Sequence, residues 1–72
     1  MHFLYQIVTS VFVYTLYEED CYPVLQMTNL FTEETKEIIH SSEILEILTF
    51  DPEISPEDYE IIEDLVSCCK HS

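Results

Sequence analysis

The chain of 72 residues contains fifteen acidic residues against two basic ones, has no glycine and no tryptophan, and carries a formal net charge of −13. Without glycine, the usual P-loop, dinucleotide-binding fingerprint, EF-hand loop and nucleophile elbow are excluded, because each needs glycine where backbone turns sharply or approaches a ligand. A hydrophobic fraction of 47% argues against intrinsic disorder, which combines high charge with low hydrophobicity. The length predicts one small acidic domain over residues 1–72 with a thin core.

The first 17 residues contain no Asp, Glu, Lys or Arg. Residues 3–17 are rich in β-branched and aromatic types and predict one long strand that can bend near Thr9 and Ser10. Polar residues interrupt this run, and it is shorter than the roughly 20 apolar residues of a membrane-spanning helix. It also lacks the basic leader and small-residue cleavage site of a signal peptide. A membrane-associated segment is therefore the less favoured alternative.

Residues 18–21 predict a turn, and residues 22–28 predict a second strand, in which Pro23 suits a strand start or an edge. A two-stranded hairpin would leave an unpaired strand edge, and such an edge invites pairing with another chain. The candidate residues for a dimer or for strand addition at this edge are Val11, Val13 and Tyr17.

Thr32, followed by Glu33 and Glu34, predicts the start of a helix, because threonine caps free N–H groups and the helix dipole favours acids in the first turn. In a single helix over 33–49 the apolar residues would point in nearly every direction. We therefore expect a break near residues 40–42 and a second segment over 43–50. This segment favours a helix, with a short strand as the alternative.

Ser55 and Pro56 predict the start of a C-terminal helix that extends to about Cys69, because serine is a good N-cap and proline fits the first helical position. At 3.6 residues per turn the helix has an apolar and an acidic face. The apolar face consists of Tyr59, Ile62, Leu65, Val66 and Cys69. The acidic face consists of Glu57, Glu60, Glu63 and Asp64. The predicted fold class is α+β, with an N-terminal antiparallel hairpin packed against two or three C-terminal helices.

The net charge of −13 is larger than solubility requires, which suggests that the acidic residues serve a function. A small domain stays soluble at a net charge of roughly 2 to 8 in magnitude, and further like charge destabilises the compact state. Carboxylates at i, i+3 and i+7 of a helix lie roughly 5 to 10 Å apart along the axis. Phosphates along one DNA strand are about 7 Å apart once helical twist is added to the axial spacing.

We therefore predict a non-catalytic protein that inhibits a basic, nucleic-acid-binding protein by mimicking or displacing its nucleic acid, without binding nucleic acid itself. The candidate partner-binding residues are Glu18, Glu19, Asp20, Glu33, Glu34, Glu37, Glu57, Glu60, Glu63 and Asp64. One alternative is a homodimeric regulatory adaptor that works through its hydrophobic strand edge, with acidity serving solubility. Another is a small membrane-associated viral protein.

In size and acidity the chain resembles phage-encoded inhibitors of restriction, CRISPR and DNA-repair enzymes, immunity proteins and antitoxins. The resemblance rests on composition and includes no sequence motif. Three cysteines, two of them adjacent, make a poor disulfide framework and favour a reducing cytoplasm, that of the host cell for a viral protein. The spacing of Cys69 and His71 does not fit a usual zinc site, so no metal or cofactor is predicted. A chain this short has little room for an enzyme pocket of about 300 Å³ or more.

Overall fold

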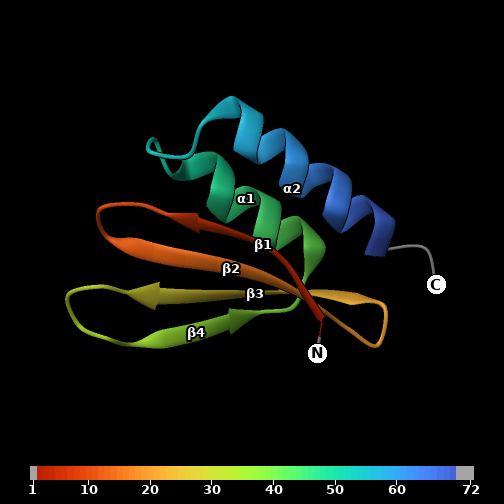
Figure 1. The fold of residues 1–72 in the computed structure, drawn as a ribbon, viewed down its shortest axis with the longest axis horizontal. Coiled ribbons are helices and arrows are strands. Elements are labelled where there is room, and N and C mark those ends of the chain that lie inside the picture. Colours follow the sequence, from red (N-terminus) through yellow and green to blue (C-terminus); the bar gives the residue numbers. More distant parts are fainter. Residues whose placement is uncertain (1, 70–72) are drawn as a thin grey trace.

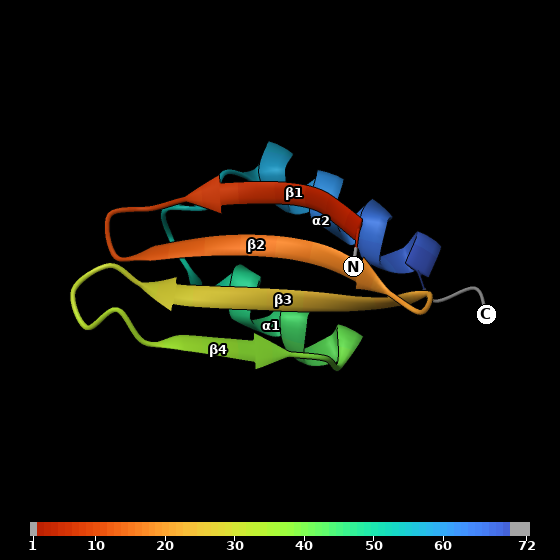
Figure 2. The same cartoon turned by 60° about the horizontal axis from the view of Figure 1, so that its bottom comes forward.

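The computed structural model describes residues 2–69 as a four-stranded antiparallel sheet followed by two helices. The elements are β1 (His2–Val8), β2 (Phe12–Glu19), β3 (Tyr22–Asn29), β4 (Thr35–Ile38), α1 (Ser41–Phe50) and α2 (Pro56–Cys69). The sheet order β1-β2-β3-β4 pairs each strand with its neighbour in sequence. Both helices lie on the same side of the sheet (Figure 1), and Figure 2 shows the opposite side uncovered. The predicted α+β class is confirmed.

The predicted single strand over residues 3–17 is wrong, because the chain reverses at residues 9–11 and forms the β1–β2 hairpin. Thr9 organises this turn. Its Oγ1 accepts hydrogen bonds from the backbone N–H groups of Phe12 (2.9 Å) and Val11 (3.3 Å). Its own N–H donates to the Phe12 carbonyl over 2.8 Å. A threonine hydroxyl and the neighbouring turn residue Ser10 thus stabilise a turn that contains no glycine, proline, asparagine or aspartate.

As a consequence β2 is an inner strand, paired with β1 on one side and β3 on the other. The predicted strand edge is therefore wrong for Val13 and Tyr17, whose backbone groups face neighbouring strands, and Val11 lies in the turn. The edges of the sheet are β1 and β4.

Residues 18–21 were expected to form a turn, and β2 and β3 are joined there by Asp20 and Cys21, with φ angles of 50° and 69°. Two successive positive φ angles are typical of the hairpin turns that asparagine and glycine favour. Aspartate tolerates this conformation better than cysteine does, because its short polar side chain hydrogen-bonds locally.

The variant Cys21→Gly should raise the free energy of unfolding by about 1 kcal/mol, since glycine adopts a positive φ without a Cβ clash. Urea unfolding followed by circular dichroism measures the change. Cys21→Ala is the matched control: it removes the sulfur but keeps the Cβ, and its stability should stay at the wild-type level. Equal stabilisation by both variants would show that the thiol, rather than the backbone angle, is responsible.

The predicted helix start at Thr32 is also wrong, since residues 30–34 form a loop and Thr35–Ile38 form β4 beside β3. The Asn29 Oδ1 accepts hydrogen bonds from the N–H groups of Phe31 (2.8 Å) and Thr32 (3.1 Å). Glu33 has a positive φ of 62°. Such side-chain bonds to nearby backbone groups compete with helix formation. Pairing with the otherwise free edge of β3 then favours a strand.

Both C-terminal helices are present. Residues 43–50 lie in α1, so the helical interpretation of this segment is confirmed and the strand alternative is wrong. Pro56 is the first residue of α2, and the Ser55 hydroxyl oxygen accepts a hydrogen bond from the Asp58 N–H over 3.2 Å. The predicted cap and the predicted extent of α2 to Cys69 are confirmed.

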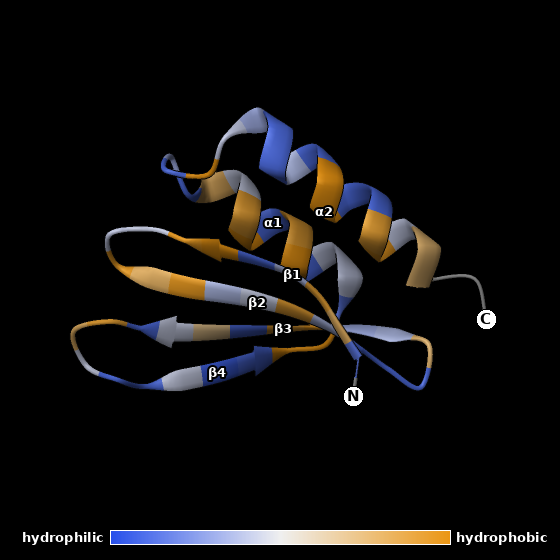
Figure 3. Cartoon of the chain, viewed as in Figure 1, coloured by the Kyte–Doolittle hydropathy of each residue, from blue (hydrophilic) through white to orange (hydrophobic). Residues whose placement is uncertain are grey.

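The core lies between the sheet and the helices. Hydrophobic and hydrophilic bands alternate along both helices in Figure 3. The most deeply buried core side chains come from both layers: Leu16, Leu25, Ile44, Leu48, Ile62 and Val66. On the predicted apolar face of α2, three residues are buried and the other two, Tyr59 and Leu65, are half-buried against the core. The thin core is thus a single layer of contacts between sheet and helices.

The uncovered side of the sheet, called the open face below, carries the side chains that point away from the helices, of which Thr15 and Val24 are themselves buried by their neighbours. Its centre is uncharged, because its two carboxylates, Glu19 and Glu37, lie at the end of β2 and on the edge strand β4. The open-face residues are Phe3, Gln6, Val8, Val13, Thr15, Tyr17, Glu19, Tyr22, Val24, Gln26, Thr28, Thr35 and Glu37.

Cys69 closes the core at the C-terminal end of α2, and its thiol donates a hydrogen bond to the Glu18 carboxylate over 3.4 Å. Burial, and secondarily this carboxylate, raises the pKa of the Cys69 thiol to about 11. Cys21 and Cys68 are exposed free thiols.

Two of the three thiols should therefore react quickly with the disulfide reagent DTNB at pH 8, and the third should react only when the protein unfolds, because a buried protonated thiol is a poor nucleophile. Peptide mass spectrometry should identify the slow residue as Cys69. In urea all three should react at similar rates. Rapid reaction of Cys69 in the folded protein would contradict its placement in the core.

Candidate acidic binding surface

Within residues 2–69, four of the fifteen carboxylates accept hydrogen bonds that hold elements of the fold together. Asp58 accepts a hydrogen bond from the Tyr5 hydroxyl over 2.6 Å, which ties α2 to β1. Glu53 accepts two hydrogen bonds from Ser10, from its hydroxyl (2.6 Å) and its N–H (3.2 Å). The other two engaged carboxylates are Asp51 and Glu18.

The remaining eleven carboxylates are exposed. They include nine of the ten predicted partner-binding residues. The exception is Glu18, which is half-buried and accepts the hydrogen bond from Cys69. The sequence interpretation missed Glu43 and Glu46, which lie on α1. Their spacing of three residues was the signal for a shared helical face, but the choice between helix and strand was open for that segment.

The exposed acids form three groups. The helix-layer acids, on α1 and α2, are Glu43, Glu46, Glu57, Glu60, Glu63 and Asp64. The turn acids, in the β2–β3 connection, are Glu19 and Asp20. The loop acids, in the β3–β4 connection and on β4, are Glu33, Glu34 and Glu37.

The predicted contact residues therefore do not form one continuous surface. The turn acids and the loop residues Glu33 and Glu34 lie at opposite ends of β3, as Figure 2 shows. A strand of eight residues is about 26 Å long. The turn acids are therefore too far from Glu33 and Glu34 for one narrow cleft to hold both groups, whereas Glu37 lies between them, beside Gln26 of β3.

The helix-layer acids are the largest group on one part of the fold. The two helices lie side by side over the sheet (Figure 1). Residues 41–69 contain no lysine or arginine, and neither helix has a basic residue in its last turn. Ordinary solvated helices mix both signs and gain from i,i+4 pairs. The helix layer lacks these local ion pairs.

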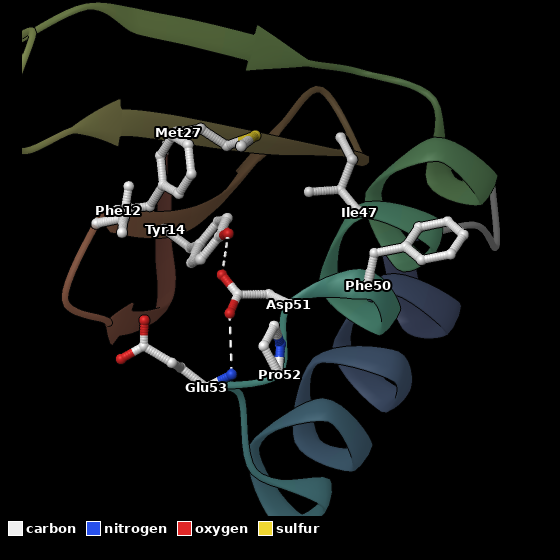
Figure 4. Close-up of a pocket in the computed structure, with 9 residues that line it drawn as sticks. Phe12, Tyr14, Met27, Ile47, Phe50, Asp51, Pro52 and Glu53 are labelled. Atoms are coloured by element: carbon white, nitrogen blue, oxygen red, sulfur yellow. Dashed lines mark hydrogen bonds between the residues drawn. The ribbon is translucent and has the colours of Figure 1, made fainter.

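Beside the helix layer, a hollow of about 510 Å³ opens between α1 and the end of the sheet (Figure 4). The hollow is larger than the roughly 300 Å³ expected of an enzyme pocket, but it is shallow and wide open to solvent, because α1 leaves this end of the sheet uncovered. The lining is mainly apolar, with Phe12, Met27 and Phe50 among its residues. The two carboxylates at its rim are Asp51 and Glu53.

Asp51 has a structural role at this hollow. It accepts hydrogen bonds from the buried Tyr14 hydroxyl and from the Glu53 N–H (3.0 Å), as the dashed lines of Figure 4 show. Burial, and secondarily the bond to Asp51, raises the pKa of Tyr14 well above its ordinary value. The Tyr14 hydroxyl therefore stays protonated at neutral pH and holds the α1–α2 connection against the sheet.

Within residues 2–69, no group of three or more His, Cys, Asp or Glu side chains is arranged to hold a metal ion. In the same part of the chain, none of the helices has the length and apolar character needed to cross a membrane. Comparison with protein-family models, with curated proteins and with solved structures finds no match for this chain.

Proposed function

We propose that this protein is a non-catalytic acidic binding protein whose helix-layer acids dock into the nucleic-acid-binding cleft of a basic partner and displace the nucleic acid. The observation that carries the proposal is the set of six exposed carboxylates on two adjacent helices without a basic residue. From the resemblance in composition and size, we propose further that this protein is a phage-type anti-defence protein that acts in the host cytoplasm.

The geometry of α2 supports this proposal. Along its axis Glu60 and Asp64 lie about 4.5 Å and 10.5 Å from Glu57, at a rise of 1.5 Å per residue. These spacings bracket the separation of backbone phosphates on a nucleic acid. The helix already fixes the backbone of these residues, so binding a partner costs side-chain entropy but little backbone entropy. Lys and Arg side chains of a nucleic-acid-binding cleft would neutralise the mutual repulsion of these carboxylates.

The test is a pull-down from bacterial lysate with the tagged protein, with and without excess duplex DNA, read by mass spectrometry. We expect the pull-down to recover a basic nucleic-acid-binding protein, and we expect excess DNA to displace it from the tagged protein. With the purified partner, neutralising three helix-layer acids (Glu57→Gln, Glu60→Gln, Asp64→Asn) should weaken binding by roughly tenfold or more, because charged contacts at an interface are lost.

The matched control neutralises the three loop acids (Glu33→Gln, Glu34→Gln, Glu37→Gln) and changes the net charge by the same amount. It should bind within about twofold of wild type in the same salt, since only long-range attraction is reduced. Equal weakening by both triple variants would show that bulk charge governs binding. A partner that DNA does not displace would contradict the proposal.

A further inference from the structure

At one end of the open face, apolar side chains form a row across β1, β2 and β3 that continues to Ile39, the residue after β4. The register pairs Phe3 with Tyr17 and Tyr17 with Val24, and places Ile39 beside Val24 just after β4. The rings of Phe3 and Tyr17 meet edge to face, with centroids 6.1 Å apart. Ile39 at the end of this row is 61% exposed, and the neighbouring Tyr22 is 60% exposed.

A hollow of about 410 Å³ lies where this row meets the β2–β3 turn. Its apolar lining consists of Tyr22, Val24 and Ile39. Its polar rim consists of Glu19, Asp20 and His40. An aromatic ring and aliphatic surface therefore lie beside two exposed carboxylates within a single concave site.

We propose that this hollow binds an arginine side chain of a protein partner. The aliphatic stem of arginine would pack mainly on Ile39, because Val24 is only 6% exposed and forms the floor of the hollow. The planar guanidinium would stack on the Tyr22 ring and donate hydrogen bonds to the turn acids. Lysine fits less well, because its compact and strongly hydrated ammonium cannot stack or bind in a fork.

The charges of the rim select this occupant over others. An apolar partner would desolvate Glu19 and Asp20 without any compensating cation, which is unfavourable. A second copy would bring its own turn acids and a further net charge of −13 towards the same face. The site lies on the side of the sheet opposite the helix-layer acids, so it does not rest on the proposed function.

The experiment is a titration of the ¹⁵N-labelled protein with N-acetyl-argininamide, followed by two-dimensional NMR. Saturable shifts are expected at the backbone amides that surround the hollow, namely those of Glu19, Asp20, Tyr22, Ile39 and His40. N-acetyl-lysinamide should bind several-fold more weakly under the same conditions.

The variant Ile39→Ser removes the apolar wall and leaves every charge in place, so it should weaken arginine binding by fivefold or more. Tyr22→Ser, at an equally exposed position, should have a similar effect. The matched control is Ile61→Ser, because Ile61 is 42% exposed and lies among the acids of α2. It should bind N-acetyl-argininamide as the wild type does.

Shifts spread evenly over the helix-layer acids would overturn the proposal, as would full binding by Ile39→Ser. A concentration-dependent dimer that occludes the hollow would also overturn it. The titration with N-acetyl-argininamide tests only the hollow. If it shows no binding while the pull-down still recovers a partner that DNA displaces, only the arginine site is refuted. If N-acetyl-argininamide binds at the hollow but DNA does not displace the partner in the pull-down, only the proposed function is refuted.

Discussion

Replacing Leu25 with alanine should lower the free energy of unfolding by about 3 kcal/mol, within the range measured for leucine-to-alanine changes in cores. Leu25 has no exposed surface, and it lies on β3 within the core that the helices cover. A domain of this length has a total stability of roughly 4 to 11 kcal/mol, so one cavity removes a large part of it. Urea unfolding followed by far-ultraviolet circular dichroism would measure the loss, and the midpoint of thermal unfolding should fall by roughly 15 °C.

The control is Leu30→Ala, which makes the same chemical change at a position in the β3–β4 loop that is 46% exposed. It should alter the free energy of unfolding by no more than about 0.5 kcal/mol, as is usual for surface substitutions. Similar losses in the two variants would show that the core does not lie between the sheet and the helices.

Tyr14 should make stability fall as the pH rises above 10. Burial, and then the hydrogen bond to Asp51, raises the pKa of Tyr14 above its ordinary value of 10.0. Above pH 10 the unfolded chain releases this proton while the folded chain retains it, so rising pH favours unfolding. Tyr14→Phe should reduce the slope of stability against pH between 10 and 12. At pH 7 it should be less stable by about 1 to 2 kcal/mol, because a hydrogen bond to a carboxylate is lost.

Urea titrations from pH 7 to 12 would measure both effects. Tyr5 and Cys69, whose pKa values are also raised, should retain part of the alkaline slope in the variant. Tyr22→Phe is the control, since its side chain lies on the surface, and its curve should follow that of the wild type. A Tyr14→Phe curve parallel to the wild type throughout would contradict the role assigned to this hydroxyl.

The C-terminal half of the fold could be predicted because its signals are local. Ser55 and Pro56 define the start of α2 by capping chemistry that involves only neighbouring residues. The apolar periodicity of α2 correctly identified its buried face. For residues 43–50 the same periodicity was too short to exclude a strand.

The N-terminal half depends on contacts that local patterns do not contain. The turn at Thr9 contains Ser10 but no glycine, proline, asparagine or aspartate, and it is held in part by Glu53, 43 residues from Ser10. The strand β4 exists because β3 offers an edge, and that pairing prevails over the helix-start signal at Thr32. Charge alone predicted nine of the eleven exposed acids in the three groups, but it missed Glu43 and Glu46 and included the half-buried Glu18. The division into these groups was not predictable, because β4 replaced the expected helix.

The order of the strands has a consequence for how the chain folds. Each hairpin joins sequence neighbours, and hairpins form within roughly 1 to 10 μs. By contrast, the contacts of α2 span long distances in sequence: 53 residues separate Tyr5 from Asp58, and 51 separate Glu18 from Cys69. Closing such large loops is slower, since contacts distant in sequence reduce folding rates. During synthesis all four strands and α1 precede α2, so the part of the sheet's inner face that α2 covers stays exposed until this last helix docks.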